Sequence, residues 1–190
     1  NNSTQLDAHF VPENVVVAFN TLVNNFSDIE IGYTNSGNYN KAPINCQFSN
    51  NIVVENLNPI VKSYGAASLA GVAFSNNIMY PTGTSSIGIS YTAPQITVVD
   101  PLLVQPVCDT PVVNCNLTNA YRVLRLSPTS PAINTATGSY PYADRDYEKQ
   151  LRTGVKDIGA DEYNGNNPIY ISAIDSTHVG PNAVNFDYSY

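Results

Sequence analysis

One short segment of the sequence combines aromatic, amide and cationic side chains in a way that suits sugar binding. It follows an apolar run at 29–33 and supplies four candidate substrate-binding residues: Tyr33, Asn38, Tyr39 and Lys41. Aromatic rings can stack on sugar rings, amides can donate to hydroxyls, and a lysine can pair with a carboxylate. An ordinary surface loop, with the stem of Lys41 lying along its apolar neighbours, explains the same residues. The residue types alone fit either interpretation.

Alternating acids at Asp144, Asp146 and Glu148 form the pattern closest to a Ca²⁺-binding loop. An EF-hand loop also needs a central glycine and a distal glutamate, which this segment lacks. Arg145 and Lys149 lie among and beside the acids, so salt links are the simpler interpretation. We therefore predict no metal site in this chain. Three later acids are interpreted as turn and cap residues: Asp157, Asp161 and Glu162.

The other cations and the two histidines form no recognisable catalytic set. Lys62, Arg122 and Arg125 lie in or beside predicted strands, where they could face a groove. A solvated outer face or a pairing with nearby acids is the preferred interpretation. His178 is interpreted as structural, and His9 either as structural or as part of the cleft of a complete enzyme. The sequence has no spacing typical of a Ser-His-Asp triad, no Gly-rich phosphate loop and no Cys/His cluster for zinc.

Charge and composition exclude several classes of partner. The chain has 8 Lys plus Arg against 15 Asp plus Glu, a net charge of −7, which argues against nucleic acid and anionic membrane surfaces. An acidic polysaccharide stays compatible, because a groove needs only local cations or a bound metal. No apolar run approaches the roughly 18 residues that span a bilayer, so we predict no membrane insertion. Cys108 and Cys115 could form a disulfide in an oxidising compartment, whereas Cys46 is expected to be a buried small hydrophobe.

An internal repeat predicts the fold. Three segments resemble one another and each is followed by a second apolar run; the segments are 15–23, 46–53 and 71–79, and the runs are 29–33, 60–64 and 87–91. When the three segments are aligned on the apolar residue that lies two positions after an asparagine in each, Asn20, Asn50 and Asn76 fall in register at steps of 30 and 26 residues. This period suits a β-solenoid whose coils stack about 4.8 Å apart, with the amides forming a ladder. The alternative is that Asn-Asn-Ile marks unrelated turns.

The predicted fold is all-β, with residues 1–163 forming coils of a parallel β-helix and 164–190 an irregular cap or tail. A Pro- and Cys-containing excursion is expected at about 93–120, and a further strand at 121–126. Residues 1–13 show no amphipathic helix that could cover the first coil, and the chain has neither an initiating Met nor a signal peptide. We therefore expect further coils before residue 1, in a removed segment or a companion chain.

Two sets of residues resemble known β-helix proteins. The ending resembles the closing coil of right-handed parallel β-helices of the pectate-lyase-like superfamily, on residues 126–133, 144–146 and 157–162. More specifically, the chain is similar to the C-terminal half of polysaccharide lyase family 6, which contains alginate lyases and chondroitinase B. That similarity is carried by Ala18–Val23, Ile29–Tyr33, Gly37–Pro43, Phe48–Val53 and Asp175–Pro181.

The resemblance implies a bacterial lyase, secreted, periplasmic or at the cell surface, that cleaves a uronate-containing polysaccharide by β-elimination. Alginate is preferred over dermatan sulfate because this half has few arginines for sulfate. The family uses a Lys base, an Arg acid and Ca²⁺ on the substrate carboxylate. None of these residues maps onto this chain, so we expect no catalytic residue here, catalytic groups and Ca²⁺ in an N-terminal half, and no activity of the chain alone. The alternatives are a non-enzymatic β-helix adhesin or carbohydrate-binding module, and a β-helix glycoside hydrolase using paired carboxylates.

Overall fold

The computed structural model describes residues 11–32, 42–64, 69–104, 124–147 and 149–165. Short strands connected by tight corners make up most of this part. They are β1 (Val16–Ala18), β2 (Thr21–Val23), β3 (Ile29–Gly32), β4 (Cys46–Ser49), β5 (Ile52–Glu55), β6 (Val61–Tyr64), β7 (Val72–Ser75), β8 (Asn77–Pro81), β9 (Ile96–Thr97), β10 (Leu103–Val104) and β11 (Arg125–Leu126). Among the described residues, no helix is long and apolar enough to cross a bilayer.

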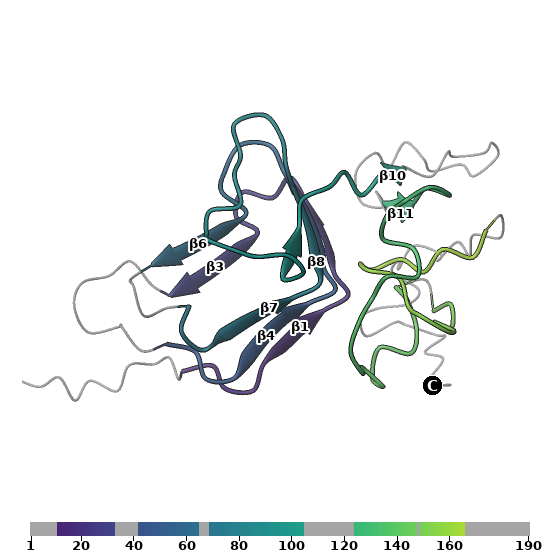
Figure 1. The fold of residues 1–190 in the computed structure, drawn as a ribbon, viewed down its shortest axis with the longest axis horizontal. Helices are drawn as coiled ribbons and strands as arrows, with labels where there is room; N and C mark the ends of the chain where they lie inside the picture. Colours follow the sequence, from purple (N-terminus) through teal and green to yellow (C-terminus); the bar gives the residue numbers. More distant parts are fainter. Residues whose placement is uncertain (1–10, 33–41, 65–68, 105–123, 148, 166–190) are drawn as a thin grey trace, which may run out of the picture.

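The first nine strands form parallel sheets in which each strand pairs with the strand three places later. The sheet orders are β1-β4-β7, β2-β5-β8-β9 and β3-β6. The three sheets form three sides around a common interior, as the view along the stack shows (Figure 1). The described part of the chain is therefore all-β, with a parallel, β-solenoid-like arrangement. To that extent, the fold class predicted from the repeat is confirmed.

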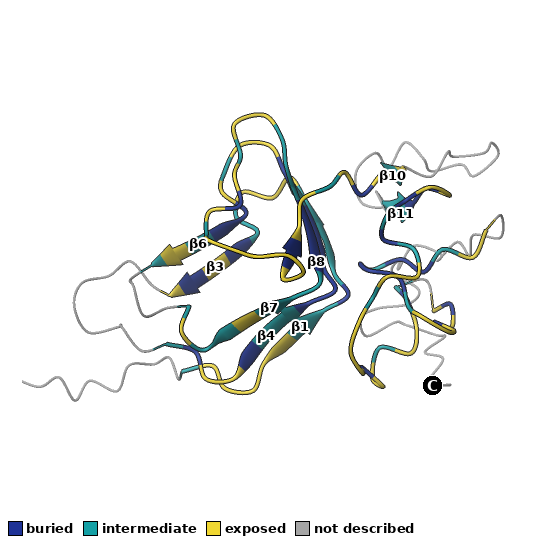
Figure 2. Ribbon diagram, in the orientation of Figure 1, coloured by how far each residue is buried: buried dark blue, intermediate teal, exposed yellow. Residues whose placement is uncertain are grey.

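Alternating side chains divide each strand between the interior and the outer surface. The interior cluster contains the buried residues Ile29, Ile31, Val53, Ile60, Val61, Met79, Ile87 and Ile96. Phe48 and Phe74 stack from successive coils with ring centroids 5.5 Å apart. Burial concentrates in the strands, and exposed residues lie mostly in the connections (Figure 2). The β-branched composition of the repeat fits this pleated, half-buried surface.

Asparagines with positive φ make the corners between the sheets. Asn14, Asn24, Asn45, Asn50 and Asn76 all have φ between 50° and 57°. Asparagine tolerates this left-handed conformation better than other residues with a Cβ, so the chain can turn sharply without glycine. The corner spacing explains why the sequence is rich in Asn between short apolar runs.

The predicted Asn column is correct for two of its three members and wrong for Asn20. The Nδ2 of Asn76 donates to the Oδ1 of Asn50 at 3.0 Å, as expected. Thr21, not Leu22, pairs with Ile52, so Asn20 lies in the neighbouring column. The observed steps between coils are 31 and 26 residues. Phe19, with φ of 58°, takes the corner position where an asparagine was expected.

Asn20, Asn51 and Asn77 form a continuous ladder, which we call the inner ladder. The Nδ2 of Asn20 donates to the Oδ1 of Asn51, and the Nδ2 of Asn51 donates to the Oδ1 of Asn77, each at 3.0 Å. The same two oxygens accept the backbone N–H of Asn20 and Asn51, also at 3.0 Å. Asn51 and Asn77 are fully buried. The inner ladder therefore joins three successive coils at one corner.

The third coil departs from the repeat after Ile87. The backbone N–H groups of Ile60 and Val61 donate to the carbonyls of Ser86 and Ile87, and pairing stops there. No strand forms at 87–91, so the strand predicted there is wrong. Gly88, with φ of 85°, turns the chain at a point where a Cβ would lie 2.1 Å from the Val61 carbonyl oxygen.

The segment expected to leave the coil at about 93–120 begins with residues that still belong to the stack. β9 pairs in parallel with β8, and Ile96 is buried in the interior. β10 then pairs antiparallel with β11, whose two residues lie within the strand predicted at 121–126. Residues 105–123, with Cys108 and Cys115, lie outside the described residues. Cys46 is buried with a free thiol, which confirms its interpretation as a small core residue.

The chain from 124 to 165, which we call the closing segment, packs beside the coils on the outer face of β2, β5 and β8. Ile52 and Ile78 form a second apolar cluster with Leu126, Ala132 and Ile158 of the closing segment. Its described residues form no parallel pairing with β1–β9. The family resemblance implied a closing coil for this region, whereas the described residues lie along the side of the stack (Figure 1).

Candidate functional site

The four predicted substrate-binding residues, Tyr33, Asn38, Tyr39 and Lys41, lie outside the described residues. Their flanks are described, because β3 ends at Gly32 and the chain is described again from residue 42. The surface that leads into this loop is the outer face of β3 and β6 with the corner that precedes β3. We call five residues of that surface the β3–β6 patch: Phe26, Ser27, Glu30, Lys62 and Tyr64.

Phe26 stands on the corner before β3 and is 89% exposed, the most exposed large apolar side chain among the described residues. The backbone carbonyl of Phe26 accepts a hydrogen bond from the Nδ2 of Asn58 at 3.2 Å, which ties two successive corners together. The Nζ of Lys62 lies 5.6 Å from the centre of the Phe26 ring. An open aromatic face beside a cation is a common arrangement in ligand recognition.

A hydrogen-bonded ion pair lies next to Phe26. The Nζ of Lys62 is 3.7 Å from the Oε1 of Glu30 and donates to the hydroxyl of Ser27 at 3.2 Å. The hydroxyls of Ser27 and Tyr64 donate to the same Glu30 oxygen, at 2.6 and 3.5 Å. This confirms the prediction that Lys62 pairs with a nearby acid. The side chains of Lys62 and Glu30 are 22% and 43% exposed, so solvent screens the pair and its contribution to stability is small.

Two acids lie beneath the β3–β6 patch, where sequence reasoning had placed none. Glu55, at the end of β5, is buried, and its Oε1 accepts the backbone N–H of Leu57 at 2.8 Å and of Asn58 at 3.2 Å. Asp28, just before β3, accepts the Nδ2 of Asn25 at 2.8 Å. Burial raises the pKa of Asp28, and the negative charge of Glu55 adds to that rise.

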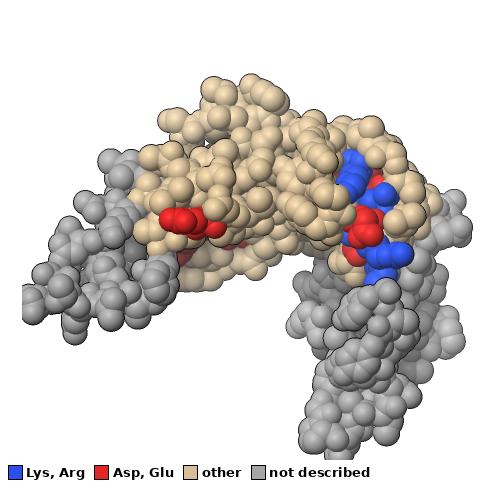
Figure 3. All heavy atoms as spheres, turned by 90° about the horizontal axis from the view of Figure 1, so that it is seen from below, with Lys and Arg blue, Asp and Glu red and all other residues tan. Residues whose placement is uncertain are grey.

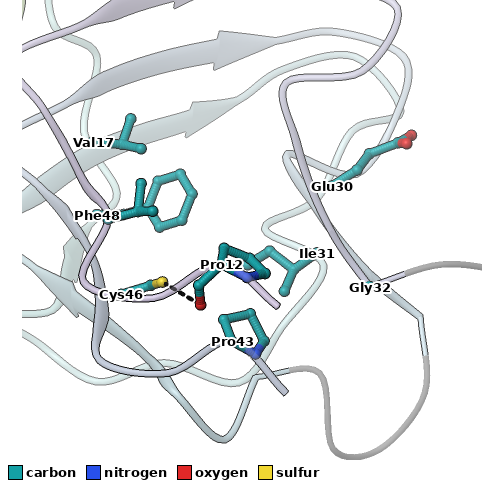
Figure 4. A pocket seen from close by; sticks show the side chains of 9 residues that line it. Pro12, Val17, Glu30, Ile31, Gly32, Pro43, Cys46 and Phe48 are labelled. Carbon is teal, nitrogen blue, oxygen red and sulfur yellow. Dashed lines mark hydrogen bonds between the residues drawn. The ribbon is translucent and has the colours of Figure 1, made fainter. Parts of the chain in front are cut away.

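An apolar pocket of about 210 Å³ opens between β1, β3 and β4 (Figure 4). Its lining comes from the interior side of the first two coils and includes Val17, Ile31, Cys46 and Phe48. The Cys46 thiol donates to the backbone carbonyl of Pro12 at 3.4 Å. Glu30 lines the pocket but points away from the apolar side chains (Figure 4). Few polar groups converge in this pocket, so it suits apolar atoms better than a hydrated sugar.

Most of the described cations lie on the closing segment, where they are mixed with acids (Figure 3). Arg152 is buried: its Nη1 lies 3.1 Å from the Oε2 of Glu162, and its Nη2 donates to the Gly159 carbonyl at 2.9 Å. Its guanidinium also lies 5.0 Å from the centre of the Phe19 ring. Lys156 donates to the carbonyl of Tyr140 at 2.7 Å. The hydrogen bonds of both cations stay within the closing segment, and they contact the coils through the Phe19 ring, from whose centre the Lys156 Nζ lies 5.7 Å.

The acids of the closing segment cap backbone groups, as predicted for Asp157, Asp161 and Glu162. Asp157 accepts the N–H groups of Asn134 and Tyr163, Asp161 accepts that of Leu126, and Glu162 accepts that of Asp157. Burial raises the pKa of both Asp157 and Glu162. Sequence reasoning missed the partner of this network, Arg152, because only folding brings it to Phe19 and Glu162.

Of the alternating acids, Asp146 takes part in a turn, and Glu148 lies outside the described residues. Asp146 is buried and accepts the N–H of Gln150 at 2.8 Å, while Arg145 donates to the Lys149 carbonyl at 2.9 Å. The salt link predicted for Arg145 is therefore not observed among the described residues, and its guanidinium bonds a backbone carbonyl instead. No group of three or more His, Cys, Asp or Glu able to hold a metal occurs in the part of the chain that the structure describes.

Of the remaining predicted cations, the described Arg125 belongs to the closing segment and not to the β3–β6 patch. Arg125 lies on β11 and pairs through its backbone with Val104. Arg122, Glu148, His9 and His178 lie outside the described residues. Sequence reasoning also missed Phe26, although an aromatic residue in a polar turn between two short strands was a usable signal.

Comparison of the chain with protein-family models, curated proteins and solved structures finds no match.

Proposed function

We propose that this chain binds a uronate-containing polysaccharide across the β3–β6 patch, as part of a right-handed parallel β-helix of the pectate-lyase-like type. The observation that carries the proposal is the 89% exposed Phe26 beside Lys62, on a regular parallel sheet face that leads into the loop holding Tyr33 and Lys41. In this proposal a sugar ring stacks on Phe26, and Lys62 exchanges Glu30 for a ligand carboxylate. Tyr64 supplies a hydroxyl to the same ligand.

The proposed cellular role is that of the C-terminal part of a secreted or periplasmic lyase acting on alginate in preference to dermatan sulfate. The sequence resemblance to polysaccharide lyase family 6 supports it, and it assigns the Lys base, the Arg acid and the Ca²⁺ ligands to an N-terminal half. The described residues offer no cluster of acids suited to Ca²⁺, so no catalytic step is assigned to them. Calcium would supply stabilisation of the carbanion-like intermediate at the substrate carboxylate.

Binding is tested with the chain itself by affinity electrophoresis and calorimetry on alginate, dermatan sulfate and neutral dextran. We expect binding to alginate that weakens with salt, because an exposed lysine contributes to it. Phe26→Ala and Lys62→Gln should each weaken binding by about tenfold, the scale of one aromatic or charged contact. Tyr142→Ala and Lys149→Gln are matched controls, since both residues are exposed but lie on the closing segment.

Equal losses for the test and control variants would reject the β3–β6 patch as the binding surface, and equal binding to dextran would reject uronate recognition. Lyase activity is a separate test on the full-length protein with Ca²⁺, by absorbance of the unsaturated uronate product. Binding without any rise in absorbance on alginate or dermatan sulfate would instead assign a non-enzymatic adhesin or carbohydrate-binding module.

A further inference from the structure

The carboxyl groups of Asp28 and Glu55, from successive coils, interact with each other. Glu55 also accepts the backbone N–H of Asn58, whose amide donates to the Phe26 carbonyl. Glu55 is 1% exposed, and although Asp28 is only half-buried, its Oδ2 atom is inaccessible to solvent. Neither the Asp28 Oδ2 nor the Glu55 Oε2 has a donor within hydrogen-bond distance among the described residues. Two buried carboxylate oxygens cannot both stay charged and unpaired without a large desolvation cost. A proton between them removes that cost.

The surroundings of the two groups decide which one carries the proton. Backbone N–H groups of Leu57 and Asn58 point at Glu55 and favour its charged form, whereas Asp28 receives one neutral amide from Asn25. For Glu55, burial works to raise the pKa, but these N–H groups and the contact with Asp28 together lower it. For Asp28 burial dominates and the pKa is raised. Asp28 is therefore the acid and Glu55 the acceptor.

We propose that Asp28 and Glu55 share one proton, and that its loss to solvent loosens the corner that holds Phe26. Deprotonation leaves two negative charges facing one another. Glu55 accepts the backbone N–H groups of Leu57 and Asn58, and the Asn58 amide donates to the Phe26 carbonyl. Repulsion that displaces Glu55 therefore weakens the turn at Asn58 and, through it, the contact that holds Phe26. This regulation rests on the proposed function for its biological meaning, because Phe26 belongs to the β3–β6 patch.

The neighbouring charged groups do not compensate this pair. Glu30 on β3 and Lys62 on β6 bind one another and Ser27 on the outer face. The third coil presents Thr82, which donates to the backbone carbonyl of Glu55 and not to its carboxylate. Within the part of the chain that the structure describes, Glu55 is the one charged group that raises the pKa of Asp28. The pair therefore titrates as a unit.

The test is a carboxyl-carbon NMR titration of the whole chain, combined with amide hydrogen exchange at Leu57 and Asn58. We expect Asp28 to titrate above, and Glu55 below, their ordinary values of 3.8 and 4.5. As Asp28 ionises, protection of the two amides should fall beyond the intrinsic pH dependence of exchange. Asp28→Asn should abolish this additional loss, while Asp100→Asn, at an exposed site on another loop, should retain it.

An Asp28 titration at or below 3.8, or an unchanged loss of protection in Asp28→Asn, would overturn the proposal. If Asp28→Asn does not fold, Glu55→Gln replaces it, and the Asp28 titration should then shift to lower pH. All these measurements are made without ligand. The proton-sharing pair can therefore fail while polysaccharide binding holds, and binding can fail while the pair titrates as expected.

Discussion

Replacing Asn51 by alanine is the most direct test of how the coils are held together. The Asn51 side chain accepts from the backbone N–H and the Nδ2 of Asn20, and donates to the Asn77 Oδ1 and the Val17 carbonyl. All four bonds are between 2.9 and 3.0 Å, and Asn51 is only 2% exposed. Water is therefore poorly placed to replace the lost partners, which leaves buried polar groups unsatisfied.

The magnitude follows from the number of bonds. Four bonds, each with a net worth of about 0.5–1.5 kcal/mol, give a loss of about 2–6 kcal/mol in the free energy of unfolding for Asn51→Ala. The matched control is Asn58→Ala, which removes one solvent-exposed bond to the Phe26 carbonyl and should cost less than about 1 kcal/mol. The two substitutions delete the same atoms, so their difference isolates the inner ladder.

Equilibrium unfolding in urea, followed by far-ultraviolet circular dichroism, measures both variants. With a slope of about 2 kcal/mol per M, Asn51→Ala should lower the urea midpoint by about 1–3 M with little change in slope. If Asn51→Ala and Asn58→Ala lowered stability equally, the inner ladder would contribute no more than a surface amide, and its role in joining the coils would be refuted.

Three further outcomes are expected from the closing segment. Gly159→Ala should destabilise by about 1–3 kcal/mol, because its φ is 97° and a Cβ would meet the Ile52 Cδ1 at 2.7 Å; thermal unfolding measures this, and an unchanged midpoint contradicts it. Arg152→Met should cost about 3–5 kcal/mol at neutral pH, because it leaves Glu162 buried without its cation; chemical unfolding beside the exposed control Arg145→Met decides it. Burial raises the pKa of Glu162, so its stabilising contribution is complete below 4.5 and falls as pH rises through the folded value. Glu162→Gln should flatten that fall in a pH series of unfolding free energies, and an unaltered slope would count against it.

The repeat in the sequence predicted the parallel stack because apolar residues and asparagines recur with the coil period. It could not predict the register of the first coil, since Phe19 replaces the expected asparagine at the corner. Phe19 is held there by the ring of Tyr140, edge-to-face at 5.4 Å, and by Arg152, both distant in sequence. A slip of one residue exchanges the inner and outer faces of a strand. Because of Phe19, the sequence alignment matched Leu22 and Asn20 with residues one position away from their true partners.

The sequence predicted the pairing of Lys62 with an acid but not the other residues of the β3–β6 patch. An ion pair with a nearby acid follows from strand pairing, because β3 and β6 place Lys62 directly opposite Glu30. The pairing of Asp28 with Glu55 could not be predicted from the sequence, because the two acids do not recur at equivalent positions of successive coils. Only the stacking of two corners of unequal sequence brings them together. The role of Tyr33, Asn38, Tyr39 and Lys41 stays a prediction.

The coils keep their register although they differ in length, and one corner absorbs the difference. Thirteen residues separate Gly32 from Cys46, whereas seven separate Tyr64 from Val72. The strands on either side of these connections still pair residue for residue. Such a scaffold permits loops at that corner to be lengthened or exchanged without rebuilding the interior. Ligand preference could thus diversify there independently of folding, and a grafted loop between 33 and 45 would be the natural place to engineer a new specificity.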